Sequence, residues 1–454
     1  MRLSLNTIRF VYKVNMSAGS DRSLRPPEQA QEVEVTERQR SHPRITLRDF
    51  FMYLGPTLIV SLAYIDPGNF GTDIAGGSQY NYGLIWAVWM ASVFAMTLQY
   101  LSGKLGIATG TGLAQLIKGS LKTRSRVISY WLAAEVAIGA TDLAEYLGTV
   151  IALNILFNIP LLYASIFGAL DVIILLALTS NRFRVIEYFF MVFVSVIAIG
   201  FLYELLLLNP SVQQIAIHSV TPDISSGTLL IVVGIVGATV MPHVLWLHSS
   251  LTSTKMSRWG IKKDDHVSKR KFLKLHQRET VVILSIAGCV NVAILVMGAA
   301  AFYRYGYTNI QQISQAYDIL GPLFGHYADK IFAITLLASG IASSVVGTLA
   351  GQEVMTAMIG AKINPYLRRV VTRGINVFPT TACILLGISP LALLFYSQVF
   401  LSVLIPLPML PLIYYTSKSS VMGPYVNRHA TTIAALIVGG AIVLLNIALI
   451  YSSI

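Results

Sequence analysis

The stretch AYIDPGNFGTD, residues 63–73, interrupts an apolar run that begins at Tyr53. About halfway along this run it places a carboxylate, a proline, a glycine and a carboxamide, at Asp66, Pro67, Gly68 and Asn69. Proline ends or kinks a helix, because it lacks an N–H and its ring clashes with the preceding turn. The stretch therefore predicts either a simple kink or a helix broken in two, whose unwound backbone can line an ion site.

The composition places this interruption inside a membrane. Of the 454 residues, 55% are hydrophobic and 12% are charged, whereas a soluble domain carries about 25% charged residues. Apolar runs of roughly 20 residues, the length that crosses a bilayer, recur along the chain. Eleven runs are predicted to be transmembrane helices, at residues 50–75, 82–102, 127–152, 160–180, 185–208, 227–251, 280–303, 330–358, 371–388, 391–416 and 430–452. The expected fold class is an all-α polytopic membrane protein.

The distribution of basic residues predicts the orientation in the membrane. All of the 33 Lys and Arg residues except Arg304 and Lys330 lie in the N-terminal segment or near alternate connections between the spans. Basic loops remain in the cytoplasm. The N-terminus is therefore expected to be cytoplasmic and the C-terminus extracytoplasmic, in the lipid bilayer of the cell membrane. This pattern explains the net charge of +12 without a nucleic-acid partner.

Two other features limit the domain organisation. Residues 1–45 are polar and without periodicity, so a disordered cytoplasmic tail is expected there, and a transmembrane domain at residues 46–454. The two cysteines, Cys289 and Cys383, lie singly within predicted spans. They are expected to be small buried side chains, without a disulfide or a thiolate metal site.

A second interruption repeats the first. In GATVMPHVLWLHSS, residues 237–250, the sixth predicted span is broken at Met241, Pro242 and His243. Breaks in the first and sixth spans are typical of two five-helix halves with inverted topology. The sequence thus predicts a first repeat at about 50–208, a second at about 227–416 and an extra helix at about 430–452.

Together the two breaks offer ligands for a metal ion. Helical spacing puts Ala63, Asp66 and Asn69 on one face, and Ala238 and Met241 repeat that spacing. Unwinding frees backbone carbonyls, notably those of Ala63 and Ala238, to face a cavity. Oxygen ligands alone suit Mg(II) or Ca(II), whereas a thioether favours softer ions such as Mn(II) or Fe(II). Core packing is the alternative for Met241, but its position beside the break proline favours a ligand.

These motifs resemble those of the Nramp family of divalent-metal transporters. The resemblance lies in the paired signatures IDPGNFGTD and GATVMPHVLWLHSS and extends in order from residue 48 to 452, through LQYLSGKLGIATGTG, AAEVAIGATDLAEYLGTVIALNILFNIPLL, ASGIASSVVGTLAGQEVM, RRVVTR and SQVFLSVLIPLPMLPLIYYTS. It implies a LeuT-type fold of 5+5 helices and import of Mn(II) or Fe(II) coupled to protons by alternating access, as in prokaryotic importers.

The resemblance also implies the ligand set. The metal would lie between helices one and six, bound by Asp66, Asn69, Met241 and the carbonyls of Ala63 and Ala238. Gln398 resembles a glutamine that completes this shell in some states. Departures from residues frequent in the family occur at Gly71, Val244 and Trp246, which are not ligand positions.

The third predicted span carries an acidic row, defined as Glu135, Asp142 and Glu145, which share one helical face. Ionisable groups within a membrane span are costly and indicate function unless they are paired. In the family, Arg368 and Arg369 face this row.

Two interpretations of the acidic row stay open. One is a structural salt bridge. The other is a proton route from Asp66 past His243 and Glu145 toward Asp142 and the cytoplasm, since histidine titrates in the appropriate range. His248 could act as a relay or as a packing residue.

Three other functions fit the sequence less well than metal import. A magnesium transporter of related fold would be expected to lack Met241, and an amino-acid transporter would not place an acid where a carboxylate binds. A membrane sensor that binds metal without moving it would be expected to carry a large output domain. No catalytic or phosphate-binding motif is found in the sequence, so no enzymatic activity, no cofactor and no obligatory protein partner are expected; metal ions and protons are the substrates.

Overall fold

The computed structural model describes residues 55–168, 183–261, 264–308 and 328–452. All of these residues belong to one compact unit, Ile45–Ile454. The tail predicted at residues 1–45 lies outside the described residues, as do much of the span predicted at 160–180 and the start of the first span.

The described residues form helices and no strand. Seven helical stretches are long and apolar enough to cross a membrane. They are α3 (Pro67–Tyr80) with α4 (Ile85–Thr109), α6 (Arg124–Phe157), α11 (Ser226–Val240) with α12 (Pro242–Arg258), α13 (His266–Ala301), α15 (Ala328–Ile359), α17 (Pro390–Leu404) with α18 (Pro406–Thr416), and α20 (His429–Ser452). The prediction of an all-α polytopic membrane protein is confirmed.

Each of the eleven predicted spans contains at least one described helix, although three are not among the seven stretches. At 160–180 only α7 (Leu161–Gly168) is described, and at 185–208 lies α9 (Phe183–Leu208), which is followed after a sharp bend by α10 (Val212–Val220). At 371–388 lies α16 (Pro365–Leu385). The sequence of α16 includes three arginines, which lower its hydropathy below that of an ordinary span.

The first and sixth spans are both broken where the sequence predicts. The first consists of α2 (Pro56–Ser61), a 3₁₀ turn at Leu62–Ile65, and α3, which starts at Pro67 after an extended Asp66. The sixth consists of α11 and α12, which meet at Met241. Each proline occupies the first helical position of the second half, where its missing N–H would have no helical partner in any case. The prolines thus end one half and begin the next.

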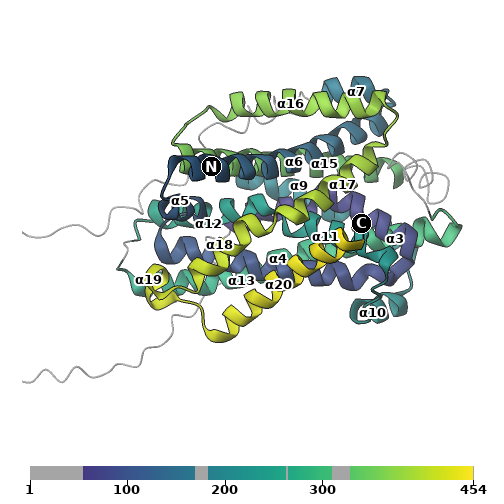
Figure 1. Cartoon of the computed structure of the whole chain (residues 1–454). Coiled ribbons are helices and arrows are strands. Elements are labelled where there is room, and N and C mark those ends of the chain that lie inside the picture. The colour runs from purple at the N-terminus through teal and green to yellow at the C-terminus, as the bar shows by residue number, and fades with distance from the viewer. Residues whose placement is uncertain (1–54, 169–182, 262–263, 309–327, 453–454) are drawn as a thin grey trace, which may run out of the picture. The chain divides into compact units, whose positions relative to one another are not determined.

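Close backbone packing holds the first break against its neighbour. A Cβ atom at Gly77 of α3 would lie 2.1 Å from the carbonyl oxygen of Leu295 and 2.7 Å from the nitrogen of Ala299, both on α13. Only glycine permits this approach, which is typical of helix packing in membranes. Figure 1 shows α11 and α12 in the interior, with α17, α18 and α20 crossing in front of them and α16 at the edge beside α6.

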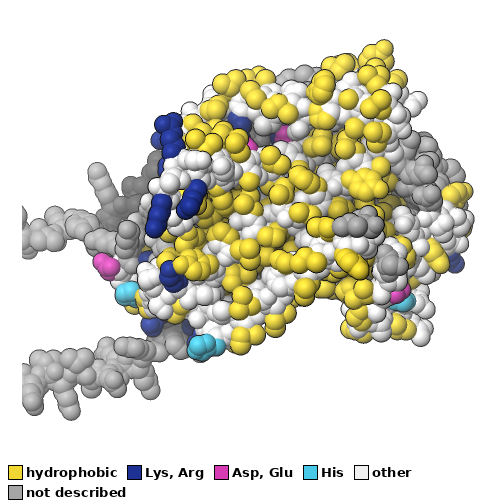
Figure 2. All heavy atoms as spheres, viewed as in Figure 1, with side chains coloured by type: hydrophobic (Ala, Val, Ile, Leu, Met, Phe, Trp, Pro, Cys, Tyr) yellow, Lys and Arg dark blue, Asp and Glu magenta, His cyan; other side chains and the backbone are white. Residues whose placement is uncertain are grey.

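The surface agrees with an embedded protein and corrects one prediction. In Figure 2 the middle of the molecule is covered largely by hydrophobic and uncharged side chains, while Lys and Arg gather toward one end. Both cysteines are free, as predicted, but Cys289 is exposed and Cys383 is partly exposed, so the prediction that they are buried was wrong. Periodicity alone did not distinguish a residue facing lipid from one facing another helix, because cysteine suits both surroundings.

Candidate metal centre and acidic row

At the first break, Asp66 is both a helix cap and a source of negative charge. One carboxylate oxygen, Oδ1, accepts hydrogen bonds from the backbone N–H of Asn69 at 2.9 Å and from its Nδ2 at 2.7 Å. The other oxygen, Oδ2, has no hydrogen-bond partner among the described residues. Asp66 and Asn69 are both completely buried. The cap therefore leaves one buried anionic oxygen available to a ligand.

The second break forces an unusual backbone conformation on Met241. Its φ is +30° and its ψ is 115°, in a region that side chains with a Cβ rarely adopt. A residue held in such a region costs about 1–3 kcal/mol. Met241 is completely buried, and α11 meets α17 so closely that a Cβ at Gly237 would lie 1.9 Å from the carbonyl oxygen of Gln398.

Asn69 joins the two breaks. Its Nδ2 approaches the carbonyl oxygen of Ala238 on α11 at 3.4 Å, and its Oδ1 accepts a hydrogen bond from the hydroxyl of Thr239 at 3.1 Å. Asn291 on α13 donates through Nδ2 to the carbonyl of Tyr64 at 2.9 Å and to Oδ1 of Asn69 at 3.3 Å. The unwound segments of helices one and six are thus tied together by one carboxamide.

Gln398 brings a second carboxamide to the same point. A Cβ at Gly68 would lie 2.5 Å from Cδ of Gln398 and 2.8 Å from Oδ2 of Asp66, so both side chains border this glycine. The Oε1 of Gln398 has no partner among the described residues, while its Nε2 donates to Ser397 at 3.1 Å. The Nε2 of Gln398 would also lie 2.5 Å from that Cβ, so a buried carboxamide and Oδ2 of Asp66 meet at the break.

Ala63 lies in the 3₁₀ turn before Asp66 and is buried. The helical face that the sequence predicted from Ala63 through Asn69 is not continuous, because the backbone of Asp66 is extended. No group of three or more His, Cys, Asp or Glu side chains within the described ranges could hold a metal. The break site, defined as Asp66, Asn69, Met241, Gln398 and the two alanine carbonyls, offers instead one carboxylate, amide and carbonyl oxygens and a thioether.

In the acidic row, Asp142 is closely paired with cations. Its Oδ1 forms an ion pair with Nη1 of Arg369 and lies 3.6 Å from Nη1 of Arg373, and its Oδ2 accepts from Nδ2 of Asn376 at 2.7 Å. Arg373 also donates to the backbone carbonyl of Asp142 at 3.1 Å and to the hydroxyl of Ser344 at 2.6 Å. Asp142 is thus held by α16 on several sides.

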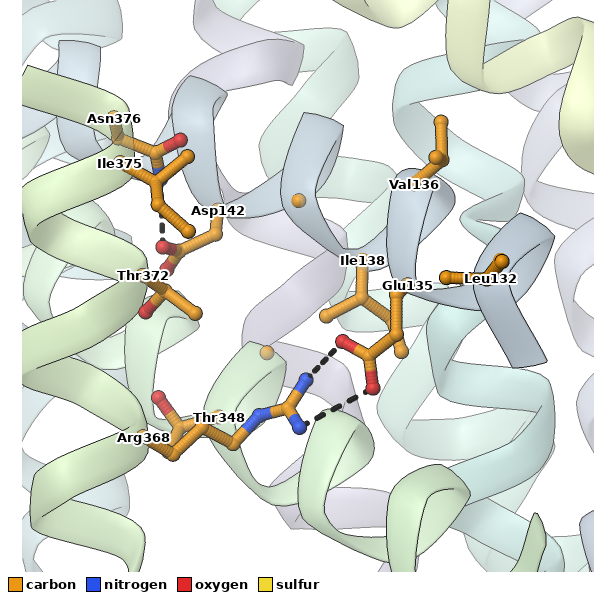
Figure 3. A pocket seen from close by; sticks show the side chains of 12 residues that line it. Leu132, Glu135, Val136, Ile138, Asp142, Thr348, Arg368, Thr372, Ile375 and Asn376 are labelled. Carbon is orange, nitrogen blue, oxygen red and sulfur yellow. Dashed lines mark hydrogen bonds and ion pairs between the residues drawn. The ribbon is translucent and has the colours of Figure 1, made fainter. Parts of the chain in front are cut away.

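Glu135 lies on the same helix, α6, and its side chain is more exposed than that of Asp142. Its carboxylate forms an ion pair with Arg368 on α16 and accepts a hydrogen bond from Nε1 of Trp131 at 2.9 Å. Figure 3 shows a cavity of about 360 Å³ with Asp142 beside Thr372 and Asn376 on one side and Glu135, to which Arg368 reaches, on the other. Two of the three members of the acidic row therefore line a cavity between α6 and α16.

The remaining candidates belong to the acidic row or adjoin the second break, with one exception. Glu145 is completely buried, and a Cβ at Gly347 of α15 would lie 2.9 Å from its Oε2. His243, in the first turn of α12, has its Nδ1 3.3 Å from the hydroxyl of Thr141, the residue before Asp142, while its Nε2 has no partner among the described residues. His243 therefore connects the second break with the acidic row.

His248 is the exception. Its Nδ1 lies 2.7 Å from Oε1 of Gln99 on α4, and its ring packs against that of His276 on α13 with 5.0 Å between centroids. It also approaches the hydroxyl of Thr57 on α2 at 3.4 Å. The structure therefore groups His248 with α2, α4 and α13 and not with the acidic row.

Comparison with known proteins identifies the family. The model of the family described as natural resistance-associated macrophage protein-like, or Nramp, matches residues 57–452. The chain belongs to the Nramp family. Two relatives named divalent metal cation transporter MntH, from Granulibacter bethesdensis and Acidiphilium cryptum, are 40% and 41% identical to it, over 88% of this chain and 88% and 90% of the relatives.

Solved structures agree with this Nramp assignment. The Eremococcus coleocola manganese transporter, crystallised with an aromatic bis-isothiourea substituted compound, is 31% identical, with a TM-score of 0.80 over 89% of this chain and 87% of that one. A transporter of the nucleobase-cation-symport-1 family, 15% identical, matches with a TM-score of 0.57 over 88% of this chain and 89% of that one, which concerns the fold alone. The predicted LeuT-type fold is confirmed, while the boundaries of its two repeats stay predictions.

Several polar residues at these Nramp sites were missed or left without a role at the sequence level. Arg373 and Asn376 contact Asp142, and Thr239 contacts Asn69. The RRVVTR motif contains Arg373, four residues after Arg369 and hence on the same helical face, which is a signal that could have found it. Asp73, two helical turns after Asp66, was also missed.

Proposed function

We propose that this chain imports Mn(II) and Fe(II) across the cell membrane by alternating access, coupled to protons. The observation that carries this proposal is the buried Oδ2 of Asp66, which has no hydrogen-bond partner among the described residues and lies beside the carboxamide of Gln398 where two broken helices meet. The names of the relatives, which describe divalent metal and manganese transporters, support the same substrate class.

The metal would be bound by the break site. Asp66 supplies the negative charge, Met241 the sulfur, and Ala63 and Ala238 backbone oxygens. In the present conformation Asn69 directs its Nδ2 toward Asp66, so its carboxamide must turn to offer its oxygen to a metal. A single thioether among oxygens favours Mn(II) or Fe(II) over Mg(II), which prefers oxygen and retains its water.

The proton would move between the break site and the acidic row. His243 supports this route, because its Nδ1 reaches Thr141 beside Asp142 and its Nε2 is buried without a partner. Glu145 would serve as the intermediate group, and Glu135 with Arg368 would border the exit at the cavity. The ion pairs of Asp142 with Arg369 and Arg373 favour a second role for the row, that of anchoring α16 to α6.

The orientation follows from the basic residues. We assign the N-terminus to the cytoplasm and the C-terminus to the outside, with repeats at about 50–208 and 227–416 on either side of the break site. His248, next to α2, would act at the cytoplasmic half of the first span.

Uptake by the full chain in proteoliposomes tests the proposal. Mn(II), Mg(II) and Ca(II) are offered separately while internal pH is recorded. We expect saturable Mn(II) uptake with acidification of the lumen and much weaker uptake of the other two ions. Equal uptake of Mg(II) would favour the magnesium-transporter alternative, and metal binding without uptake would favour a sensor.

A further inference from the structure

Asp73 is a second buried carboxylate on the helix that Asp66 begins. It lies in the middle of α3 and is completely buried, yet neither of its carboxylate oxygens has a hydrogen-bond partner among the described residues. A neutral carboxyl group with a structural role would still donate its O–H to an acceptor, as buried polar groups nearly always do. The bonding of Asp73 is therefore incomplete in the present conformation.

The neighbours of Asp73 along α3 show which way its side chain is directed. Asn69, four residues earlier, contacts Asn291 of α13, and Gly77, four residues later, packs on the backbone of α13. Residues four apart lie on one face of a helix, so Asp73 faces α13 between these two contacts.

On that part of α13 a single polar side chain is present. The segment from residue 291 to 298 reads NVAILVMG, in which only Asn291 is polar. The Nδ2 of Asn291 is directed to the break site, whereas its Oδ1 has no partner among the described residues. Asp73 lies one turn, about 6 Å along the axis, beyond the contact between Asn69 and Asn291. The facing helices thus offer further unpartnered oxygens next to the break site.

We propose that Asp73 and Oδ1 of Asn291 form an outer binding site for the divalent cation, which the metal occupies before it reaches Asp66. This inference rests on the proposed function and on the orientation in which α3 leads from the break site toward the outside. Asp73 lies about 10 Å, two helical turns, from Asp66. That distance is long enough for two separate sites and short enough for a cation to pass from one to the other when water enters.

The chemistry of the outer site differs from that of the break site. A carboxylate, an amide oxygen and water suit hard divalent cations and do not discriminate strongly between Mn(II), Ca(II) and Mg(II). The thioether of Met241 is absent from this set. The outer site therefore collects divalent cations, and the break site selects among them.

Binding of Mn(II) to the purified full chain in lipid nanodiscs tests the site directly, since the electron paramagnetic resonance signal reports free Mn(II). We expect two classes of bound Mn(II) in the wild type. Asp73→Asn should lose the weaker class and Asp66→Asn the tighter one, while the double variant Asp66→Asn/Asp73→Asn should lose both. An Asp73→Asn variant that binds the same number of ions with the same affinities would refute the proposal. Asp73→Ser, judged by its melting temperature, serves as a second variant if Asp73→Asn does not fold.

Uptake kinetics supply a second readout. Asp73→Asn should raise the KM for Mn(II) about tenfold, through loss of local cation attraction, while kcat changes much less. The increase should be similar for Mn(II) and Cd(II), because no sulfur is lost. Asp223→Asn is the matched control, since Asp223 is an exposed acid in the segment before α11, and its KM should stay within about twofold of the wild type.

The two proposals fail differently. A wild-type chain that binds two classes of Mn(II) but transports none would refute the proposed function and retain the outer site. An Asp73→Asn variant with wild-type binding and KM, in a chain that transports Mn(II), would refute the outer site alone.

Discussion

Asp66 and Asp142 are both buried aspartates within the membrane domain, but their surroundings differ completely. Asp142 contacts Arg369, Arg373 and Asn376, all from α16. Among the described residues, Asp66 accepts hydrogen bonds from Asn69 through Oδ1, and its Oδ2 has no hydrogen-bond partner. The protein itself neutralises the charge of Asp142, whereas the charge of Asp66 is available to a proton or a metal ion that enters and leaves the site.

The difference has an energetic meaning. An unpaired carboxylate in a low-dielectric interior costs several kcal/mol, so it binds a proton or a cation whenever one is available. A carboxylate between two guanidinium groups gains little by binding a proton or a further cation. Its removal leaves buried positive charge behind. Asp66 therefore suits exchange between metal and proton, and Asp142 suits a fixed contact.

The largest effect is expected at Asp66. Asp66→Asn removes the only formal negative charge of the break site, so Mn(II) uptake into proteoliposomes should fall to background. The melting temperature should not decrease, because the substitution removes an unpaired buried charge. The exposed Asp223→Asn variant provides the control. Near-normal uptake by Asp66→Asn would remove the metal from this position.

The opposite pattern is expected at Asp142. Asp142→Asn removes the carboxylate that pairs with Arg369 and Arg373, which should cost about 3–5 kcal/mol and lower the melting temperature by several degrees. Adding Arg369→Gln should restore part of the loss. If the melting temperature stays unchanged while metal-driven acidification decreases, Asp142 carries protons and does not anchor α16. Glu145→Gln, measured in the same way, shows whether proton flux depends on the row at all.

Met241→Ala tests whether the thioether at the break site binds the metal. Water would occupy the vacated position, and an all-oxygen site should still move Mn(II), since manganese accepts oxygen ligands. The ratio of Cd(II) to Ca(II) uptake should fall about tenfold, as expected from the loss of a soft ligand. An unchanged ratio would mean that the sulfur only packs.

The smallest effect is expected at Glu135. Its side chain is 24% exposed, so the ion pair with Arg368 is partly screened by its surroundings. Glu135→Gln should change the free energy of unfolding by about 1 kcal/mol or less. A loss as large as that of Asp142→Asn would contradict the distinction between Glu135 and Asp142.

The sequence predicted the broken helices and the residue types at the breaks, because Pro67 and Pro242 act locally on the backbone. It did not predict which carboxylates are paired. Arg373 reaches Asp142 only because α16 lies along α6, and helical periodicity indicates a face but not the neighbour that covers it. Asp73 was missed for the same reason. Its carboxylate oxygens have no hydrogen-bond partner among the described residues, and only the structure shows this.

The backbone contact between Gly77 of α3 and α13 determines which helices can move relative to one another. Two helices in backbone contact cannot slide without opening a gap, so α3 and α13 should travel as one rigid body. By contrast, the start of α2 is held to α13 by a hydrogen bond from the N–H of Gly55 to Oε1 of Glu279 at 3.0 Å, which a rotation of one side chain can break. We therefore expect the extended Asp66 to act as a hinge about which α2 moves while α3 stays in place. Spin labels should report a constant distance between α3 and α13 during metal binding and a changing one between α2 and α13; a changing distance in the first pair would place the hinge elsewhere.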